Sequence, residues 1–263
     1  MTISISDSDS QGDLGPARHR HLKRAPIREA LIDFRVQLAE GVTVQGLEQM
    51  AVQLEGDYPT KGIIQTLQAQ LDVAGPIIKP DLRHGKLGVL LKSPDEKTQV
   101  QFRLNGFTLN RLKPYTSWEE IYPETIRLWR LYVEFAKPTV VVRLAARYIN
   151  QLELPLPVIN LRNYFIAPPQ VPESLPQTLR AYLTRVVIHE PSLEHSAIVT
   201  QSFEPNPTDK EHAAILLDID AFKSVALKPV EHEEIDRVLN DLHRFKNDVF
   251  FGSITQRASK LFE

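Results

Sequence analysis

Two arginines four residues apart are the sharpest chemical signal in the chain. Arg143 and Arg147 lie in the apolar run from residue 138 to 150, which has the composition of a β-strand. Successive side chains of a strand point to opposite faces, so residues four apart share a face. Planar guanidinium groups suit carboxylate or phosphate oxygens held in pairs. The spacing therefore predicts either a site for an anionic ligand or ion pairs with carboxylates of a neighbouring strand.

A pair of aspartates offers a second chemistry. Asp218 and Asp220 flank Ile219 in an expected strand, so their carboxylates share a face at a separation of about 7 Å. Such a pair could hold a magnesium ion or serve as acid and base, and pairing with the arginines in a structural network is the alternative. His189 lies before Pro191, which interrupts any helix there, so the histidine-glutamate spacing of helical zinc sites is absent. We expect no metal site and no cofactor.

One face of the expected strands is unusually polar. An antiparallel sheet can expose such a face to water with its charges neutralised, or use it as a polar concavity for a ligand, peptide or partner domain. The candidate ligand-binding residues on this face are Arg35, Arg103, Arg143, Arg147, Arg185, Asp218 and Asp220. Alternation also assigns to it Asp33, Gln68, Gln70, Asn105 and His189.

The elements that must position these residues follow from the apolar periodicity. Alternation predicts strands at about 26–38, 63–73, 86–91 and 98–104, and again at 138–150, 179–188, 197–203 and 212–219. Helical spacing predicts helices at about 44–55, 118–133, 161–165 and 233–251, the first capped by Thr43. Runs of strands separated by helices are typical of an α+β protein.

The two halves share short sequences at a nearly constant offset. Leu112-Lys113-Pro114 and Leu227-Lys228-Pro229 are 115 residues apart, and Gln65-Thr66-Leu67 and Gln177-Thr178-Leu179 are 112 apart. We therefore predict two tandem β-α-β-β-β-α repeats that form a curved antiparallel sheet covered on one face by long helices. The expected division is a flexible N-terminal arm at 1–25, a first repeat at 26–137 and a second at 138–263, the repeats forming one integrated domain.

Composition limits the function classes. The formal net charge is −2, which makes nucleic acid a disfavoured partner without excluding it. The absence of cysteine excludes disulfides, thiolate catalysis and cysteine-based metal sites, and fits a reducing compartment. The N-terminus lacks the apolar core of a signal peptide, and no run approaches the roughly 20 apolar residues of a spanning helix, so we expect a cytoplasmic location without membrane contact.

Three segments carry a resemblance to a known family. They are Arg143-Leu144 with Arg147-Tyr148-Ile149-Asn150, the helix around Trp118 before it, and Leu217-Asp218-Ile219-Asp220 with Phe250 and Ile254-Thr255. The opening strand Pro26-Ile27-Arg28-Glu29-Ala30 is a further shared feature. Through them the chain, from residue 26 on, resembles a sporadically distributed set of uncharacterised bacterial proteins of similar length. The resemblance implies a bacterial origin and a whole-chain domain but supplies no mechanism, and patchy distribution would suit an accessory, toxin-antitoxin or defence role. The order of elements is also similar to the tandem TATA-binding-protein-like fold, and a fold does not carry function.

Three function classes remain at this point. The first is a non-enzymatic binding module whose polar sheet face recognises an anionic ligand or a protein partner through Arg143 and Arg147. The second is a metal-dependent hydrolase or nuclease that uses Asp218 and Asp220, with His189 as a further member. The third is a structural homo-oligomer.

Overall fold

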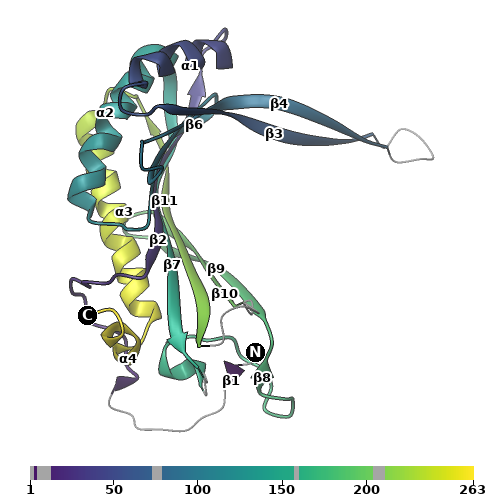
Figure 1. Ribbon diagram of the computed structural model, residues 1–263, viewed down its shortest axis with the longest axis vertical. Helices are drawn as coiled ribbons and strands as arrows, with labels where there is room; N and C mark the ends of the chain where they lie inside the picture. Colours follow the sequence, from purple (N-terminus) through teal and green to yellow (C-terminus); the bar gives the residue numbers. More distant parts are fainter. Residues whose placement is uncertain (1–2, 5–12, 73–78, 157–159, 204–210) are drawn as a thin grey trace.

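The computed structural model describes residues 3–4, 13–72, 79–156, 160–203 and 211–263, with the side chains of residues 66–84 outside that description. In this part of the chain, nine strands form one open antiparallel sheet in the order β3-β4-β5-β6-β2-β7-β11-β10-β9 (Figure 1). The strands are β2 (Ile27–Leu38), β3 (Thr60–Asp72), β4 (Lys79–Lys92), β5 (Thr98–Arg103), β6 (Gly106–Leu112), β7 (Pro138–Pro155), β9 (Tyr182–Glu190), β10 (His195–Phe203) and β11 (His212–Leu227). A separate two-stranded sheet pairs β1 (Ile3–Ser4) with β8 (Thr178–Leu179).

The helices are few and two of them are long. They are α1 (Val44–Ala51), α2 (Trp118–Ala136), α3 (His232–Ser253) and α4 (Gln256–Lys260), with 3-10 turns η2 (Val52–Leu54) and η3 (Leu161–Asn163). Helix α1 begins where expected, because the Thr43 hydroxyl accepts a hydrogen bond from the Gly46 amide. None of the helices in the described residues combines the length and the apolar character needed to span a membrane.

Alternation along the central strands builds the core. On β2, Ile32 and Phe34 are fully buried on one face, whereas Asp33 and Arg35 point to the other. Helix α3 packs on β11, β7 and β10, and α2 contacts β6. The indole of Trp129 on α2 stacks on Phe34 at 4.3 Å between ring centroids. The core therefore lies between the helices and the middle of the sheet.

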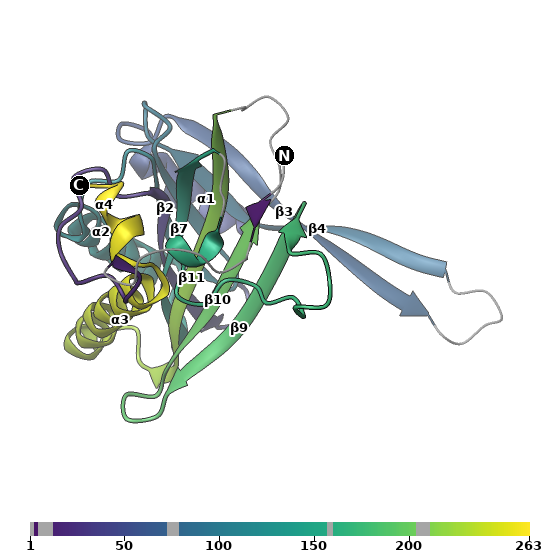
Figure 2. The same cartoon turned by 90° about the horizontal axis from the view of Figure 1, so that it is seen from below.

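The predicted repeat architecture is wrong. The first half contains an additional strand, β6, and the second half has only the turn η3 where a helix was expected and places β8 outside the large sheet. Long helices do not cover the sheet either. The β3–β4 hairpin projects away from the body, and β9 at the opposite edge lies beyond the helices (Figures 1 and 2). Helices and an antiparallel sheet are both present, as the α+β assignment expects.

A segment assigned to the flexible arm lies along the C-terminal helices. The Ala17 amide donates to the carbonyls of Phe251 and Ile254, and the Arg24 amide donates to the carbonyl of Phe262. Ala17 and Leu22 are buried. Residues 16–24 therefore form one wall beside the end of α3.

Candidate functional site

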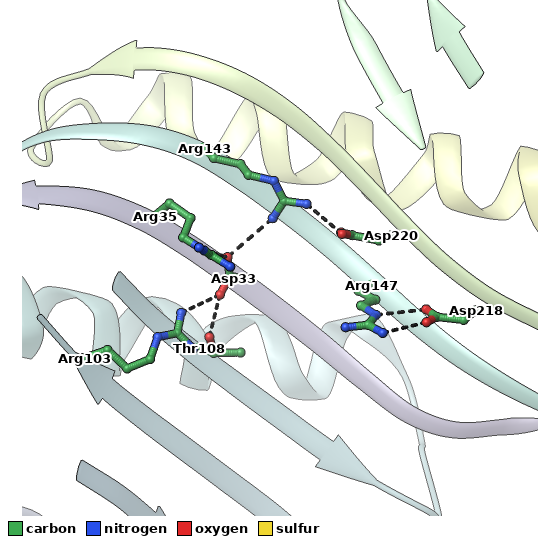
Figure 3. A network of polar contacts seen from close by, with 8 residues as sticks. All are labelled: Asp33, Arg35, Arg103, Thr108, Arg143, Arg147, Asp218 and Asp220. Atoms are coloured by element: carbon green, nitrogen blue, oxygen red, sulfur yellow. Dashed lines mark hydrogen bonds and ion pairs between the residues drawn. The ribbon is translucent and has the colours of Figure 1, made fainter. Parts of the chain in front are cut away.

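Four of the candidate arginines form ion pairs on the sheet face away from the helices, three of them around Asp33 and Asp220 and the fourth, Arg147, separately with Asp218. We call this group the arginine–aspartate network, and Figure 3 shows its eight residues: Asp33, Arg35, Arg103, Thr108, Arg143, Arg147, Asp218 and Asp220. They come from strands β2, β5, β6, β7 and β11. Thr108 was not among the residues predicted for this face, whereas the other seven were, and the ion pairs among them agree with a shared face.

Asp33 is the centre of this network. Its carboxylate accepts from Arg103 at 2.7 Å and from the Thr108 hydroxyl at 2.6 Å, and Arg143 reaches it at 3.5 Å. Burial acts to raise the pKa of Asp33, but the Arg103 charge and the Thr108 hydrogen bond outweigh it and hold the pKa below its usual value. Asp33 is therefore ionised and fully engaged.

Each of the two candidate aspartates is bonded to an arginine. Arg147 binds Asp218 through Nε at 2.9 Å and a terminal nitrogen at 2.6 Å, the bidentate geometry that suits a carboxylate. Arg143 binds Asp220 at 2.7 Å. The sequence analysis left open whether the arginines would meet a ligand or these carboxylates, and the structure pairs them with the carboxylates.

The remaining predicted residues lie outside this network. Arg185 is exposed on β9, in register with Thr200 of β10, which is in register with Asp218. His189 bonds the Ser196 hydroxyl at 3.1 Å and does not join the aspartates. Asn105 lies in the turn between β5 and β6, and the side chains of Gln68 and Gln70 lie outside the described part. Within the described residues, no cluster of three histidine or acidic side chains is arranged to hold a metal ion.

A cavity of about 760 Å³ lies on the other face of the sheet, beside α3. Its walls come from the N-terminal segment at residues 19–27, from residues 115–119 at the start of α2, from β7 and from α3. This volume is within the range of pockets for small molecules. We call it the α3 cavity.

Lys246 is the most unusual group in the α3 cavity. Only 6% of the residue is exposed, and its Nζ lies 3.4 Å from the centroid of the Tyr148 ring. Within the described residues, its ammonium group has this aromatic face as a neighbour but no bonded carboxylate. Burial lowers the pKa of Lys246 to about 7, because removing an ammonium from water disfavours its charged form.

Aromatic side chains supply the apolar part of the cavity wall. Trp118 stacks on His243 at 4.4 Å, with the rings almost parallel, and donates from its indole nitrogen to Asn240 at 3.0 Å. The hydroxyls of Tyr115 and Tyr148 are 3.1 Å apart. Burial and the charge of Lys246 together lower the pKa of His243 to about 4, so its imidazole is neutral at pH 7.

Basic side chains line the N-terminal side of the same cavity. His19, Arg20, His21 and Lys23 line it, while Glu119 is the acidic residue that lines it from the start of α2. Arg20 is already paired with Glu263 at 2.5 Å. His21 and Lys23 are exposed. The balance of charge around the cavity is therefore positive, which favours an anionic occupant.

The sequence analysis missed this cavity, although one signal was present. Lys246 follows Leu242 by four residues, Leu239 by seven and Ile235 by eleven, so it interrupts the apolar stripe of the expected helix at 233–251. A lysine on a stripe that faces a core is either paired or functional. Which segments close around it depends on tertiary contacts that periodicity does not specify.

The comparisons with known proteins give no relative for this chain. No protein-family model matches it, and neither the search of curated proteins nor that of solved structures found a match. The resemblance drawn from Arg147-Tyr148-Ile149-Asn150 and the TATA-binding-protein-like element order therefore stays a prediction.

Proposed function

We propose that this protein is a cytoplasmic, non-enzymatic binding module that takes a small anionic molecule into the α3 cavity. The observation that carries the proposal is Lys246, a buried amine on the wall of a cavity large enough for a ligand, with no carboxylate bonded to it in the described residues. Burying an unpaired ammonium costs several kcal/mol, and perturbed groups of this kind concentrate at functional sites. An acidic ligand would supply the missing partner.

The cavity supports this proposal better than the arginine–aspartate network does. Arg143 and Arg147 are already bonded to Asp220 and Asp218, so an anion at either guanidinium competes with a carboxylate that is in place. A ligand carboxylate at Lys246 breaks no ion pair that the described residues make. Its apolar part can lie against the rings of Trp118 and Tyr148.

A thermal-shift titration tests the proposal, with benzoate and phenyl phosphate as probes. Ligand at a hundredfold excess over its dissociation constant stabilises the fold by about 2.7 kcal/mol. For a chain of this length this raises the melting temperature by about 5–10 °C. The shift is expected to disappear in Lys246→Met and to persist in Arg147→Ala. Loss in Arg147→Ala with retention in Lys246→Met would place the anion on the network instead, and no shift with either probe counts against an anion module.

The two alternative functions receive less support. A metal-dependent hydrolase needs Asp218 and Asp220 to be available, and each carboxylate is bonded to a guanidinium. A magnesium-dependent thermal shift that Asp218→Ala abolishes would support the hydrolase.

The homo-oligomer has one feature in its favour. The exposed apolar residues Leu183, Val186 and Val187 of β9 lie at an edge of the sheet to which no described strand pairs. The native mass of the protein gives the number of chains in the assembly and so tests the homo-oligomer.

A further inference from the structure

We infer that the Lys246 amine captures a small aldehyde or ketone that carries an acidic group, by forming a reversible imine inside the α3 cavity. This inference rests on the proposed function and names the chemical class of its ligand. A lysine nucleophile must be neutral, and desolvation in an apolar pocket is one of the ways proteins achieve this.

The surroundings of Lys246 make its amine easier to deprotonate, and no carboxylate of the described residues is bonded to it. Its Nζ lies over the ring of Tyr148, and burial brings its pKa to about 7, so roughly half of the amine is neutral at that pH. An exposed lysine, with a pKa near 10.4, is neutral in fewer than about one molecule in a thousand. Lys246 is thus the reactive amine of the cavity, whereas Lys23, also on the cavity lining, is exposed to water.

The titratable groups around the cavity are compatible with imine chemistry. His243 lies three residues before Lys246 on α3, so the two share a helix face, and its imidazole is neutral at pH 7 and adds no charge beside the amine. Tyr115 and Tyr148 stay protonated, because burial raises the pKa of both phenols. Glu119 lines the cavity from the start of α2, and the basic residues at 19–23 line it from the N-terminal segment. The charges of Arg20 and Lys23 are suited to the acidic group of the ligand.

The reaction balances without an oxidant or a reductant. The nitrogen lone pair of Lys246 forms a bond to the carbonyl carbon, while the carbonyl π electrons move to oxygen. A proton passes from nitrogen to that oxygen and gives a carbinolamine. Loss of one water then leaves a carbon–nitrogen double bond, so amine and carbonyl compound give imine and water. Hydrolysis reverses each step, which makes the capture a mode of binding and not a turnover.

Trapping with 4-carboxybenzaldehyde tests the inference, since this probe joins an aldehyde, an aromatic ring and a carboxylate. The folded full-length protein is incubated with the probe and cyanoborohydride at pH 7, and peptide mass spectrometry then measures labelling at each lysine. We expect Lys246 to be labelled at least about tenfold faster than the exposed Lys97, as its larger neutral fraction requires. Excess benzoate should protect Lys246 and leave Lys97 unchanged, and Lys246→Met should remove the fast label.

The outcomes separate this inference from the proposed function. If benzoate stabilises the wild type but not Lys246→Met, and Lys246 is labelled no faster than Lys97, the anion site stands and the imine is refuted. If neither benzoate binding nor preferential labelling is found, both fail. Fast labelling of Lys246 that benzoate does not slow would overturn the inference in another way, because the reactive amine would then lie outside the anion site.

Discussion

Replacing Lys246 by methionine should stabilise this protein at neutral pH and should do so less as the pH rises. The folded pKa of Lys246 is lowered to about 7, whereas an unfolded lysine titrates near about 10.4. Between these values the unfolded chain binds more protons, so stability increases with pH. Below about pH 7 the full cost of burying the amine is present, and above about pH 10.5 it is gone.

The magnitude follows from the two pKa values. The linkage relation gives a cost of about 4 kcal/mol at pH 7 and about 1.5 kcal/mol at pH 9.5. The contact of Lys246 with the Tyr148 ring offsets about 0.5–2 kcal/mol of this while the amine is charged. Lys246→Met keeps the length of the side chain without the charge, so it should stabilise by about 2–4 kcal/mol at pH 7. The corresponding rise in melting temperature is about 5–15 °C.

Urea unfolding of the wild type and the variant at pH 7 and pH 9.5 measures this difference. The matched control is Lys97→Met, because Lys97 is exposed and its replacement should change stability by less than about 0.5 kcal/mol at either pH. A gain for Lys246→Met that is equal at the two pH values would refute the reasoning, as would a loss of stability at pH 7. Either result would mean that the amine is hydrated or paired in the folded protein.

Two further substitutions test the sheet. Asp33→Asn removes the central carboxylate of the arginine–aspartate network, which is 15% exposed, and should cost about 2–4 kcal/mol in urea unfolding. Asp57→Asn, at a carboxylate 64% exposed, should cost less than about 1 kcal/mol, and equal losses would contradict the central place of Asp33. Gly88→Ala would place its Cβ 2.1 Å from the carbonyl oxygen of Phe102, so it should lower the melting temperature strongly or prevent folding. The control is Gly252→Ala, which has open space around its Cβ and should be neutral or stabilise the helix by up to about 1 kcal/mol. If the two variants had similar melting temperatures, β4 and β5 would not be packed as closely as the structure shows.

Local elements were largely predictable from the sequence. The alternation that predicted a strand at 26–38 corresponds to β2, and the apolar stripe that predicted a helix at 233–251 corresponds to α3. Strand β6 was missed, although Asn105-Gly106, a common turn signal, marks its start. Its five consecutive buried residues from Gly106 to Asn110 reflect its position in the middle of the sheet. Whether a segment forms a helix or a strand is largely a local property, so the period of its apolar residues and the residues of its turns identify it.

The assembly of these elements was not predictable in the same way. The shared Leu-Lys-Pro segments suggested equivalent repeats, but residues 161–163 form only a 3-10 turn, so the two halves do not contain the same elements. The shared polar face was predictable, because alternation fixes the side to which Arg143 and Asp220 point. The α3 cavity was not predictable, because it forms where lining residues 19–27 meet those of α3, which lie at least 216 residues further along the chain (243 − 27).

Whether the α3 cavity retains a small anion is best measured by native mass spectrometry of protein isolated gently from its own host, because one spectrum reports bound small molecules and the number of chains in the assembly. We expect the wild-type mass to exceed that of the chain and activation to release a small anion, whereas a Lys246→Met variant prepared in parallel should carry none. A wild type without added mass would contradict anion binding in the α3 cavity. An equal excess of mass in both proteins would contradict it too, because the cavity would then not be the site that retains the ligand.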